Sequence, residues 1–313
     1  ITFIDTPGHA AFTEMRARGS KITDIVVLVV AANDGIKPQT IEAIKHAKAA
    51  KVPIIVAINK CDLQGIDKIK VKNQLLEHEL IVEDLGGEIL CIEISALKQT
   101  NLDKLKEAIL LQSEILDLKT NSKQSAKGVV IESRLDKGKG PVSTILVTSG
   151  TLKKGDLFVS GISSGKVRAI YDHNGKDLLE AKPSSPVEII GLNKVNDAGD
   201  DFVVLKDENQ IKEIILYREN IQKNKKNGQS SNKDNIFENK EKEGKLNIIL
   251  KADVHGSLEA LANAISKIQI KGVIPKLILS AVGPITETDI TLAKASNATL
   301  IGFNIRPNKE AKE

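Results

Sequence analysis

An acidic residue followed closely by a glycine and a histidine opens the chain, in the stretch ITFIDTPGH. The apolar run at 1–5 predicts a buried strand that ends at Asp5. A carboxylate in that place is suited to holding Mg²⁺ beside nucleotide phosphates, directly or through a water molecule. Gly8 lets a backbone N–H approach a terminal phosphate without a Cβ atom in the way. A plain polar turn that includes His9 is the competing interpretation.

A second polar group follows the apolar run at 52–59. Here Asn59, Lys60 and Asp62 come at and just past the end of the expected strand, which is where ligands lie in doubly wound sheets. A carboxylate in this position can accept hydrogen bonds from the N1–H and the exocyclic amine of guanine, which adenine cannot reproduce. Asp62 therefore predicts a site that is specific for guanine.

A third loop follows the run at 89–95. Ser95, Ala96 and Leu97 stand there, and their backbone amides are suited to supporting a bound base. Three such loops, in order, at the ends of successive expected strands favour one nucleotide site over three unrelated turns.

The elements that must position these loops alternate along the first third of the chain. Runs that are apolar on both faces predict strands at 1–5, 25–32, 52–59 and 89–95, and such strands belong to a parallel sheet covered on both sides. Amphipathic patterns predict helices at 37–51 and 101–115, the first with Pro38 in its first turn. The series indicates an α/β, doubly wound fold.

The pattern changes twice after this region. From 127 to about 207, short strands separated by glycine turns predict a small β-barrel or sandwich. A polar stretch predicts a linker, either a solvated helix or disordered. A last unit with strand and helix patterns, including a capping box at Thr286 and Asp289, predicts a compact, incomplete α/β domain. The expected organisation is a partial nucleotide-binding domain at 1–120, a β-barrel at 125–210, a linker at 211–245 and an α/β domain at 246–313.

Composition limits the remaining possibilities. The 313 residues carry 45 Lys plus Arg and 41 Asp plus Glu, so the net charge of +4 does not by itself argue for nucleic acid. Cys61 and Cys91 form neither a disulfide framework nor a zinc motif, which favours a reducing, cytoplasmic setting. The longest apolar runs fall short of the roughly 20 residues of a membrane helix, and we expect no membrane partner.

The three loops, read as DTPGH, NKCD and SAL, resemble those of the translational GTPases. Within that class the chain is most similar to the family of bacterial-type translation initiation factor 2, through DTPGHAAFTEMRARGSKITDIVVLVVAANDGIKPQT, KADVHGSLEAL and AVGPITETDITLAKASNATLIGFNIRP. The resemblance implies a P-loop GTPase domain, a second β-barrel domain and a third α/β domain. It also implies GTP or GDP and Mg²⁺ as ligands, with Asp5 as the magnesium residue. The implied nucleotide-binding residues are Asp5, Thr6, Pro7, Gly8, His9, Asn59, Lys60, Asp62, Ser95, Ala96 and Leu97.

The same resemblance implies a function and partners. His9 would orient the attacking water and stabilise its transition state, in a GTPase that promotes initiator tRNA binding and ribosomal subunit joining. The implied partners are both ribosomal subunits with their RNA, and initiator tRNA through carboxy-terminal domains that these residues do not include. Six basic residues on expected turns of the β unit are available to RNA phosphates. They are Lys137, Lys139, Lys153, Lys154, Lys166 and Arg168.

The chain departs from the family in one motif. The phosphate-binding pattern G-x-x-x-x-G-K-[ST] does not occur in the 313 residues, so the phosphate-cradling lysine and the Mg²⁺-binding hydroxyl are not found. We therefore expect a sheet with an unpaired strand edge. After the DTPGH loop, Arg16, Arg18 and Lys21 are interpreted either as a mobile switch that touches the large ribosomal subunit or as a solvated helix face.

Two other functions stay open at this point. Another translational GTPase, such as an elongation factor, would share the three loops, although the last 68 residues favour initiation. A non-catalytic ribosome-binding fragment is the alternative from a different class, since the phosphate-binding motif is not found.

Overall fold

The computed structural model describes residues 1–136, 138–231, 244–268 and 273–313. The chain folds as two compact units: residues 3–119 form one, and residues 120–313 form the other together with the first two residues. Within the described residues, no helix combines the length and the apolar character needed to cross a membrane.

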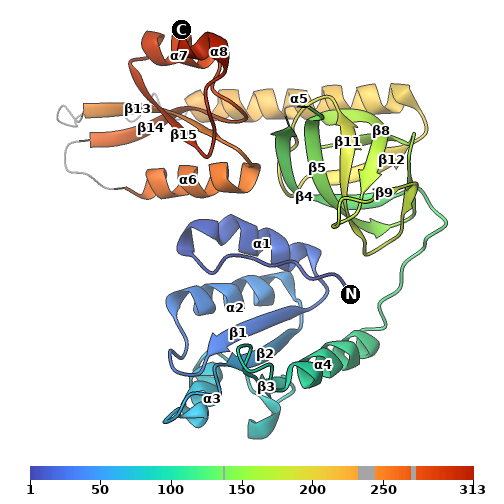
Figure 1. The fold of residues 1–313 in the computed structure, drawn as a ribbon, viewed down its shortest axis with the longest axis vertical. Coiled ribbons are helices and arrows are strands. Elements are labelled where there is room, and N and C mark those ends of the chain that lie inside the picture. Colours follow the sequence, from blue (N-terminus) through green and yellow to red (C-terminus); the bar gives the residue numbers. More distant parts are fainter. Residues whose placement is uncertain (137, 232–243, 269–272) are drawn as a thin grey trace. The chain divides into compact units, whose positions relative to one another are not determined.

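The unit at 3–119 is built on a parallel sheet of order β1-β2-β3 (Figure 1). Its strands are β1 (Val26–Ala31), β2 (Ile54–Asn59) and β3 (Cys91–Glu93), and its helices are α1 (Thr13–Ile22), α2 (Pro38–Ala50), α3 (Lys68–Glu77) and α4 (Leu102–Ile115). Two 3₁₀ turns, η1 (Ala10–Phe12) and η2 (Glu83–Leu85), complete it. β2 is central, and four of its residues from Ile55 to Ile58 are fully buried, as the two-sided apolar pattern predicted.

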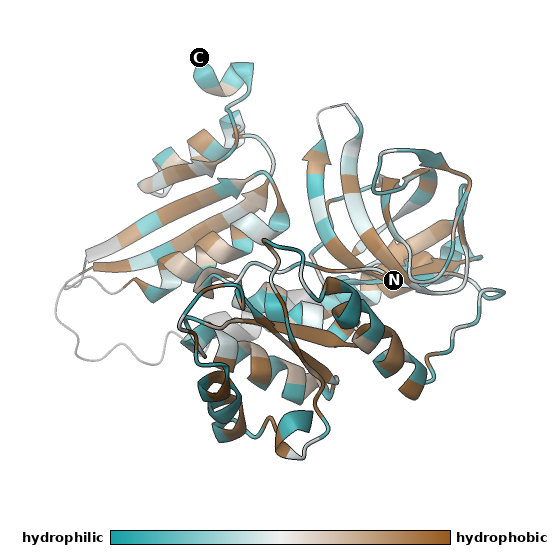
Figure 2. Cartoon of the chain, turned by 60° about the horizontal axis from the view of Figure 1, so that its bottom comes forward, coloured by the Kyte–Doolittle hydropathy of each residue, from teal (hydrophilic) through white to brown (hydrophobic). Residues whose placement is uncertain are grey.

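The predicted first strand is not formed. Residues 1–5 have no ladder partner among the described residues, and Ile1 and Phe3 are 78% and 71% exposed. β1 is accordingly an edge strand, and Val29 on it is 57% exposed. Figure 2 shows the strands of this sheet as mainly hydrophobic. An apolar sequence alone does not make a strand, because a strand also needs a neighbour to take up its backbone hydrogen bonds.

The β unit is a closed barrel. Six strands form its wall in the order β11-β5-β4-β12-β7-β8, and β11 pairs again with β8 to close it. The bounds are β4 (Lys127–Asp136), β5 (Gly140–Ser149), β7 (Leu157–Ser160), β8 (Ser163–Tyr171), β11 (Pro186–Leu192) and β12 (Asp201–Leu205), with the short strands β6 (Leu152–Lys153), β9 (Asp177–Leu178) and β10 (Glu180–Ala181) at the rim. Phe158 and Phe202 stack in the core with ring centroids 4.8 Å apart. Of the two folds that the glycine-turn pattern predicted, a β-barrel or a β-sandwich, the structure has the barrel.

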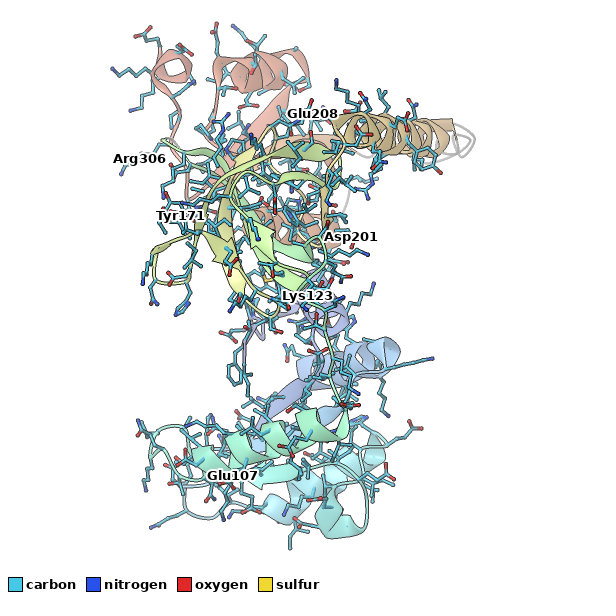
Figure 3. The ribbon with its side chains drawn as sticks, turned by 90° about the vertical axis from the view of Figure 1, so that its right-hand side faces the viewer. Glu107, Lys123, Tyr171, Asp201, Glu208 and Arg306 are labelled. Carbon is cyan, nitrogen blue, oxygen red and sulfur yellow. The ribbon has the colours of Figure 1, made fainter. Side chains whose placement is uncertain are left out.

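Basic residues on this barrel lie near its surface. Lys139 places its Nζ 4.7 Å from the ring centroid of Tyr171, which Figure 3 labels on β8. Lys154 forms an ion pair with Asp177 at 2.6 Å. Lys137 lies outside the described residues.

The polar stretch after the barrel begins as a helix. α5 (Glu208–Ser231) starts at Glu208, labelled in Figure 3, so the helical alternative applies to this part of the stretch, while residues 232–243 lie outside the described residues. The last part of the chain, predicted as an α/β domain at 246–313, forms a parallel sheet of order β14-β13-β15. Its elements are β13 (Gly244–Ala252), α6 (His255–Lys267), β14 (Val273–Val282), α7 (Glu287–Ala295), β15 (Ala298–Phe303) and α8 (Lys309–Lys312).

A buried ion pair ties β13 to the start of α7. Lys251 Nζ lies 3.1 Å from Asp289 Oδ2, and the two side chains are 9% and 7% exposed. Asp289 also accepts hydrogen bonds from the N–H and the hydroxyl of Thr286, both at 2.8 Å, which completes the predicted capping box. Burial raises the pKa of Asp289, but these hydrogen bonds and Lys251 outweigh it and hold the pKa below its usual value of 3.8.

We expect Asp289→Asn to lower the local stability of this domain by about 3 kcal/mol, because Lys251 would keep a buried charge without its partner. The measurement is hydrogen exchange of the β13 and α7 amides in the whole chain. Glu287→Gln, an exposed change in the same helical turn, is the control and should have little effect. Because the folded-state pKa of Asp289 is the lower one, its stabilisation is present above pH 3.8 and is lost as the pH falls through the folded value. Equal effects of the two variants would contradict this account.

Candidate functional site

Asn59 joins two of the predicted loops. It ends β2, and its side-chain Oδ1 accepts hydrogen bonds from the N–H of Lys60 at 2.8 Å and from the N–H of Ala96 at 3.0 Å. The parallel pairing of β2 with β3 brings the two loops to the same edge of the sheet. The Ala96 amide, which the sequence suggested as support for a base, thus holds Asn59 in this structure.

Asp62 and Ser95 form the second link between these loops. The buried hydroxyl of Ser95 donates to Asp62 Oδ1 at 2.7 Å and accepts from the N–H of Lys98 at 3.1 Å. The hydrogen bond from Ser95 is the main cause that holds the pKa of Asp62 below its ordinary value. The carboxylate is thus kept ionised and oriented, which is what a bidentate acceptor for guanine requires.

The backbone of the NKCD loop turns sharply at Lys60, which has a φ of 65°. Its ammonium lies 3.7 Å from Asp34 Oδ2, in the loop that follows β1. Sequence reasoning missed Asp34, although its place just past a buried strand is the signal that identified Asp62. Through Asp34, the loops that follow all three strands of this sheet meet at one edge.

The DTPGH loop lies elsewhere in the same unit. Residues Asp5, Thr6 and Gly8 line a cavity of about 380 Å³, which is bounded by the free edge of β1 and by residues of α1 and α2. A Cβ atom built on Gly19 of α1 would lie 3.4 Å from Thr6 Cγ2, so the loop passes close to this helix. His9 is exposed and precedes η1 as its N-cap. No interaction between this loop and the NKCD or SAL loops is found in the part of the chain that the structure describes.

Arg16 does not fit the solvated-face interpretation of the basic residues on α1. Its side chain is 7% exposed and bonds to the DTPGH loop, so it is not part of a solvated face. Lys21, by contrast, is exposed.

The cysteines take no reactive part in this arrangement. Cys61 donates from Sγ to the carbonyl of Ile58 at 3.2 Å, and burial raises the pKa of its thiol. Burial also raises the pKa of Cys91 to about 11. Both side chains therefore stay protonated near neutral pH and act as packing groups.

A larger cleft lies on the barrel. It measures about 710 Å³ and has the mixed lining of Lys123, Lys153, Lys206, Asp156 and Glu180 along with neighbouring polar residues. None of the predicted site residues belongs to it, so its size does not make it the nucleotide site.

The donor set at Asp5 can be tested for a metal. Within the described ranges no group of three or more His, Cys, Asp or Glu side chains is placed to hold an ion. Mg²⁺ is commonly bound by one or two carboxylates together with phosphates and waters, rather than by a cage of protein ligands. A lone Asp5 beside the cavity fits that mode, in which most ligands would come from a bound nucleotide.

Family models match three successive parts of the chain. The Elongation factor Tu GTP binding domain matches residues 1–114, Elongation factor G domain 2 matches 125–205, and Translation-initiation factor 2 matches 222–313.

Solved structures share the fold. The GDP-bound aIF5B from Aeropyrum pernix aligns over 99% of this chain and 58% of its own, with a TM-score of 0.59 and 23% identity, which shows likeness of fold alone. The translation elongation factor SelB from Methanococcus maripaludis in its apo form aligns over 66% of this chain and 46% of its own, with a TM-score of 0.52 and 27% identity.

Curated relatives are much more similar in sequence. Translation initiation factor IF-2 of Pelagibacter ubique is 59% identical, over 100% of this chain and 43% of the relative. The IF-2 of Rhodospirillum rubrum is 53% identical, over 100% of this chain and 37% of the relative. The chain thus spans well under half the length of the relatives it matches. By these matches it belongs to the translation initiation factor IF-2 family of translational GTPases.

Proposed function

We propose that this chain carries the guanine-recognition loops and the catalytic histidine of a translation initiation GTPase. Such a protein promotes initiator tRNA binding, helps the ribosomal subunits to join, and hydrolyses GTP when they have joined. The observation that carries the proposal is the hydrogen-bonded set of Asn59, Asp62, Ser95 and Ala96 at the ends of adjacent parallel strands. It occurs in a chain that is 59% identical to an IF-2.

Recognition of the nucleotide is divided among the three loops. Asp62 accepts two hydrogen bonds from guanine, and Asn59 with Ser95 holds the NKCD loop for it. Gly8 brings its N–H to the terminal phosphate, and a Cβ on it would meet no other atom within 4 Å, so this side of the loop is open to a ligand. The remaining residues of these loops complete the nucleotide site. They are Lys60 and Leu97 on the side of the base, and Thr6 and Pro7 on the side of the phosphates.

Hydrolysis transfers a phosphoryl group to water, and the protein contributes position and charge. His9 orients the water that attacks the γ-phosphate. When bound with the nucleotide, Mg²⁺ neutralises charge on the phosphate oxygens, and Asp5 would hold it. The phosphate-cradling lysine of other GTPases is not among these residues.

The ribosome and initiator tRNA are the proposed partners. The match of residues 222–313 to Translation-initiation factor 2 supports initiation over elongation. Contact with initiator tRNA would use parts of the relatives outside the matched region.

The test uses an extended protein, which joins this chain to the parts of the Pelagibacter ubique relative that lie outside the matched region. GTP hydrolysis is followed after large ribosomal subunits are mixed with small subunits that carry initiator tRNA. The proposal expects hydrolysis that rises when the subunits join. Stimulation by elongating ribosomes alone would favour an elongation factor instead. Salt-sensitive binding of the chain to ribosomes, with no nucleotide dependence in the extended protein, would favour a non-catalytic role.

A further inference from the structure

Arg16 is a cation buried under the DTPGH loop. Its Nη1 donates to the carbonyl oxygens of Pro7 at 3.0 Å and of His9 at 2.7 Å. Its Nη2 donates to Thr13 Oγ1 at 3.3 Å and to Glu42 Oε1 at 2.9 Å. One guanidinium therefore connects the loop before α1, α1 itself and α2.

The two carbonyl groups that Arg16 holds belong to the residues on either side of Gly8. Packing does little to fix this part of the loop, since Gly8 and His9 are exposed and no heavy atom lies within 4 Å of a Cβ placed on Gly8. Two donors restrain the backbone at this point: the Arg16 guanidinium, which holds both carbonyl groups, and the N–H of Phe12, which donates to the carbonyl of His9 at 3.1 Å. The carbonyl carbon of His9 is bonded to the Cα that carries the imidazole, so holding this carbonyl restrains the backbone from which the imidazole projects.

Glu42 provides a firm anchor for Arg16. It lies in α2, which packs against the sheet through the buried residues Ile44 and Ala47. Partial burial raises the pKa of Glu42, but hydrogen bonds from Arg16 and Thr13 outweigh it and hold the pKa below its ordinary value, so the carboxylate is ionised at neutral pH. His46 Nε2 lies 3.4 Å from the same oxygen. The ion pair therefore joins the loop to the part of the unit that packs on the sheet.

Burial of Arg16 carries a free-energy cost at one atom. Its Nε is buried without a hydrogen-bond partner among the described residues, and such an unpaired donor carries a free-energy cost. Proteins accept such unfavourable local features mainly at functional sites. The unpaired Nε therefore supports a functional role for Arg16 at this loop.

We propose that Arg16 is a positioning residue for GTP hydrolysis: anchored by Glu42, it fixes the carbonyls of Pro7 and His9 and so aims the His9 imidazole. This inference rests on the proposed function for its catalytic consequence. Its structural part, the restraint of the loop, is independent of that function.

The structural part is tested in the present chain. Backbone order parameters of Gly8 and His9 are measured by NMR in the unsubstituted chain and in Arg16→Gln. We expect a fall from about 0.85 to below about 0.6, the values typical of rigid and flexible backbone. Lys45→Gln, which removes an exposed positive charge from α2, is the matched control and should leave both values unchanged. Unchanged order in Arg16→Gln would overturn the proposal.

The catalytic part is tested in the extended protein. Arg16→Gln should lower kcat for ribosome-stimulated GTP hydrolysis by about 10- to 100-fold, because small misplacements of a reacting group have effects of this size. KM and the affinity for GDP should change less than about twofold. Glu42→Gln, which keeps the bonds to the loop but weakens their anchor, should show a smaller loss. An unchanged kcat in Arg16→Gln would overturn the positioning role.

A charge exchange separates positioning from simple stabilisation. Arg16→Glu combined with Glu42→Arg restores an ion pair between α1 and α2, but a carboxylate cannot donate to the carbonyls of Pro7 and His9. The double variant should therefore regain the Tm lost by Arg16→Glu alone without regaining kcat. Recovery of kcat together with Tm would reduce Arg16 to a structural role. If the unsubstituted extended protein shows no stimulated hydrolysis while the order parameters behave as expected, the proposed function fails and the restraint of the loop stands.

Discussion

His9→Ala in the extended protein is expected to lower ribosome-stimulated GTP hydrolysis by about 10²- to 10⁴-fold, the range typical of a positioned acid–base or water-orienting side chain. The imidazole is exposed, at the end of a loop whose backbone Arg16 holds, so it is free to reach a water beside the terminal phosphate. Binding of GDP should stay the same, because GDP has no γ-phosphate for His9 to face. Tm should also stay the same, because His9 is exposed.

The measurement is single-turnover hydrolysis after the subunits are mixed, beside a GDP titration of the same samples. His173→Ala is the matched control, since His173 is an exposed histidine in the turn between β8 and β9 of the barrel. The control should hydrolyse GTP at the unsubstituted rate. Full turnover in His9→Ala would remove His9 from the catalytic role.

Asp62→Asn is expected to exchange the base preference of the extended protein from guanine to xanthine. The carboxylate accepts from the N1–H and the exocyclic amine of guanine, whereas an amide presents an NH₂ donor that suits the C2 carbonyl of xanthine. Each hydrogen bond to a charged group contributes about 1.5–3 kcal/mol, so the loss of two corresponds to about 10²- to 10⁴-fold in GTP affinity. Asn59 still holds the loop through the N–H groups of Lys60 and Ala96, and the amide oxygen introduced by Asp62→Asn can still accept from the Ser95 hydroxyl, so the change acts on recognition.

Competition between GTP and xanthosine triphosphate measures this exchange. Asp103→Asn, an exposed change in the first turn of α4, is the control and should keep the preference for GTP. A variant at Asp62 that still prefers GTP would exclude this carboxylate from the base site.

Much of the fold could be predicted because its signals are local. The two-sided apolar runs predicted β1, β2 and β3 to within a few residues, and Pro38 marked the first residue of α2. The capping box at Thr286 and Asp289 needed only a spacing of three residues. These features depend on residues that are close together in the sequence, so the sequence alone is enough to predict them.

Errors arose where the outcome depends on distant partners. Residues 1–5 have a strand-like composition, but no strand pairs with them in the ranges that the structure describes, so they form no ladder there. Apolar spacing predicts one helix face from Leu258, Leu261, Ala262, Ile265 and Ile268. The structure ends α6 at Lys267, however, and Ile268 is 48% exposed. Periodicity gives the face of a helix but not its last residue.

In the candidate site, too, local features were predicted and contacts between distant residues were not. The sequence predicted that Asn59, Asp62 and Ser95 lie close together, because each stands at the end of an expected strand. The carboxyl ends of parallel strands share one edge of a sheet. Nothing in the sequence indicated that Arg16 would be buried, because its partner Glu42 lies 26 residues away on another helix. Asp34 carried the same signal as Asp62 and was overlooked because no motif drew attention to it.

The most direct test of the central claim is a titration of fluorescent GTP and GDP, in Mg²⁺, into this chain and into the extended protein. The account predicts binding by the extended protein, weakened by Asp62→Asn, and no binding by this chain at the same concentrations, since its 313 residues lack the phosphate-binding motif. Equal binding by both would mean that the phosphates are held by groups other than those described. No binding by the extended protein would contradict the assignment of these loops to a guanine nucleotide.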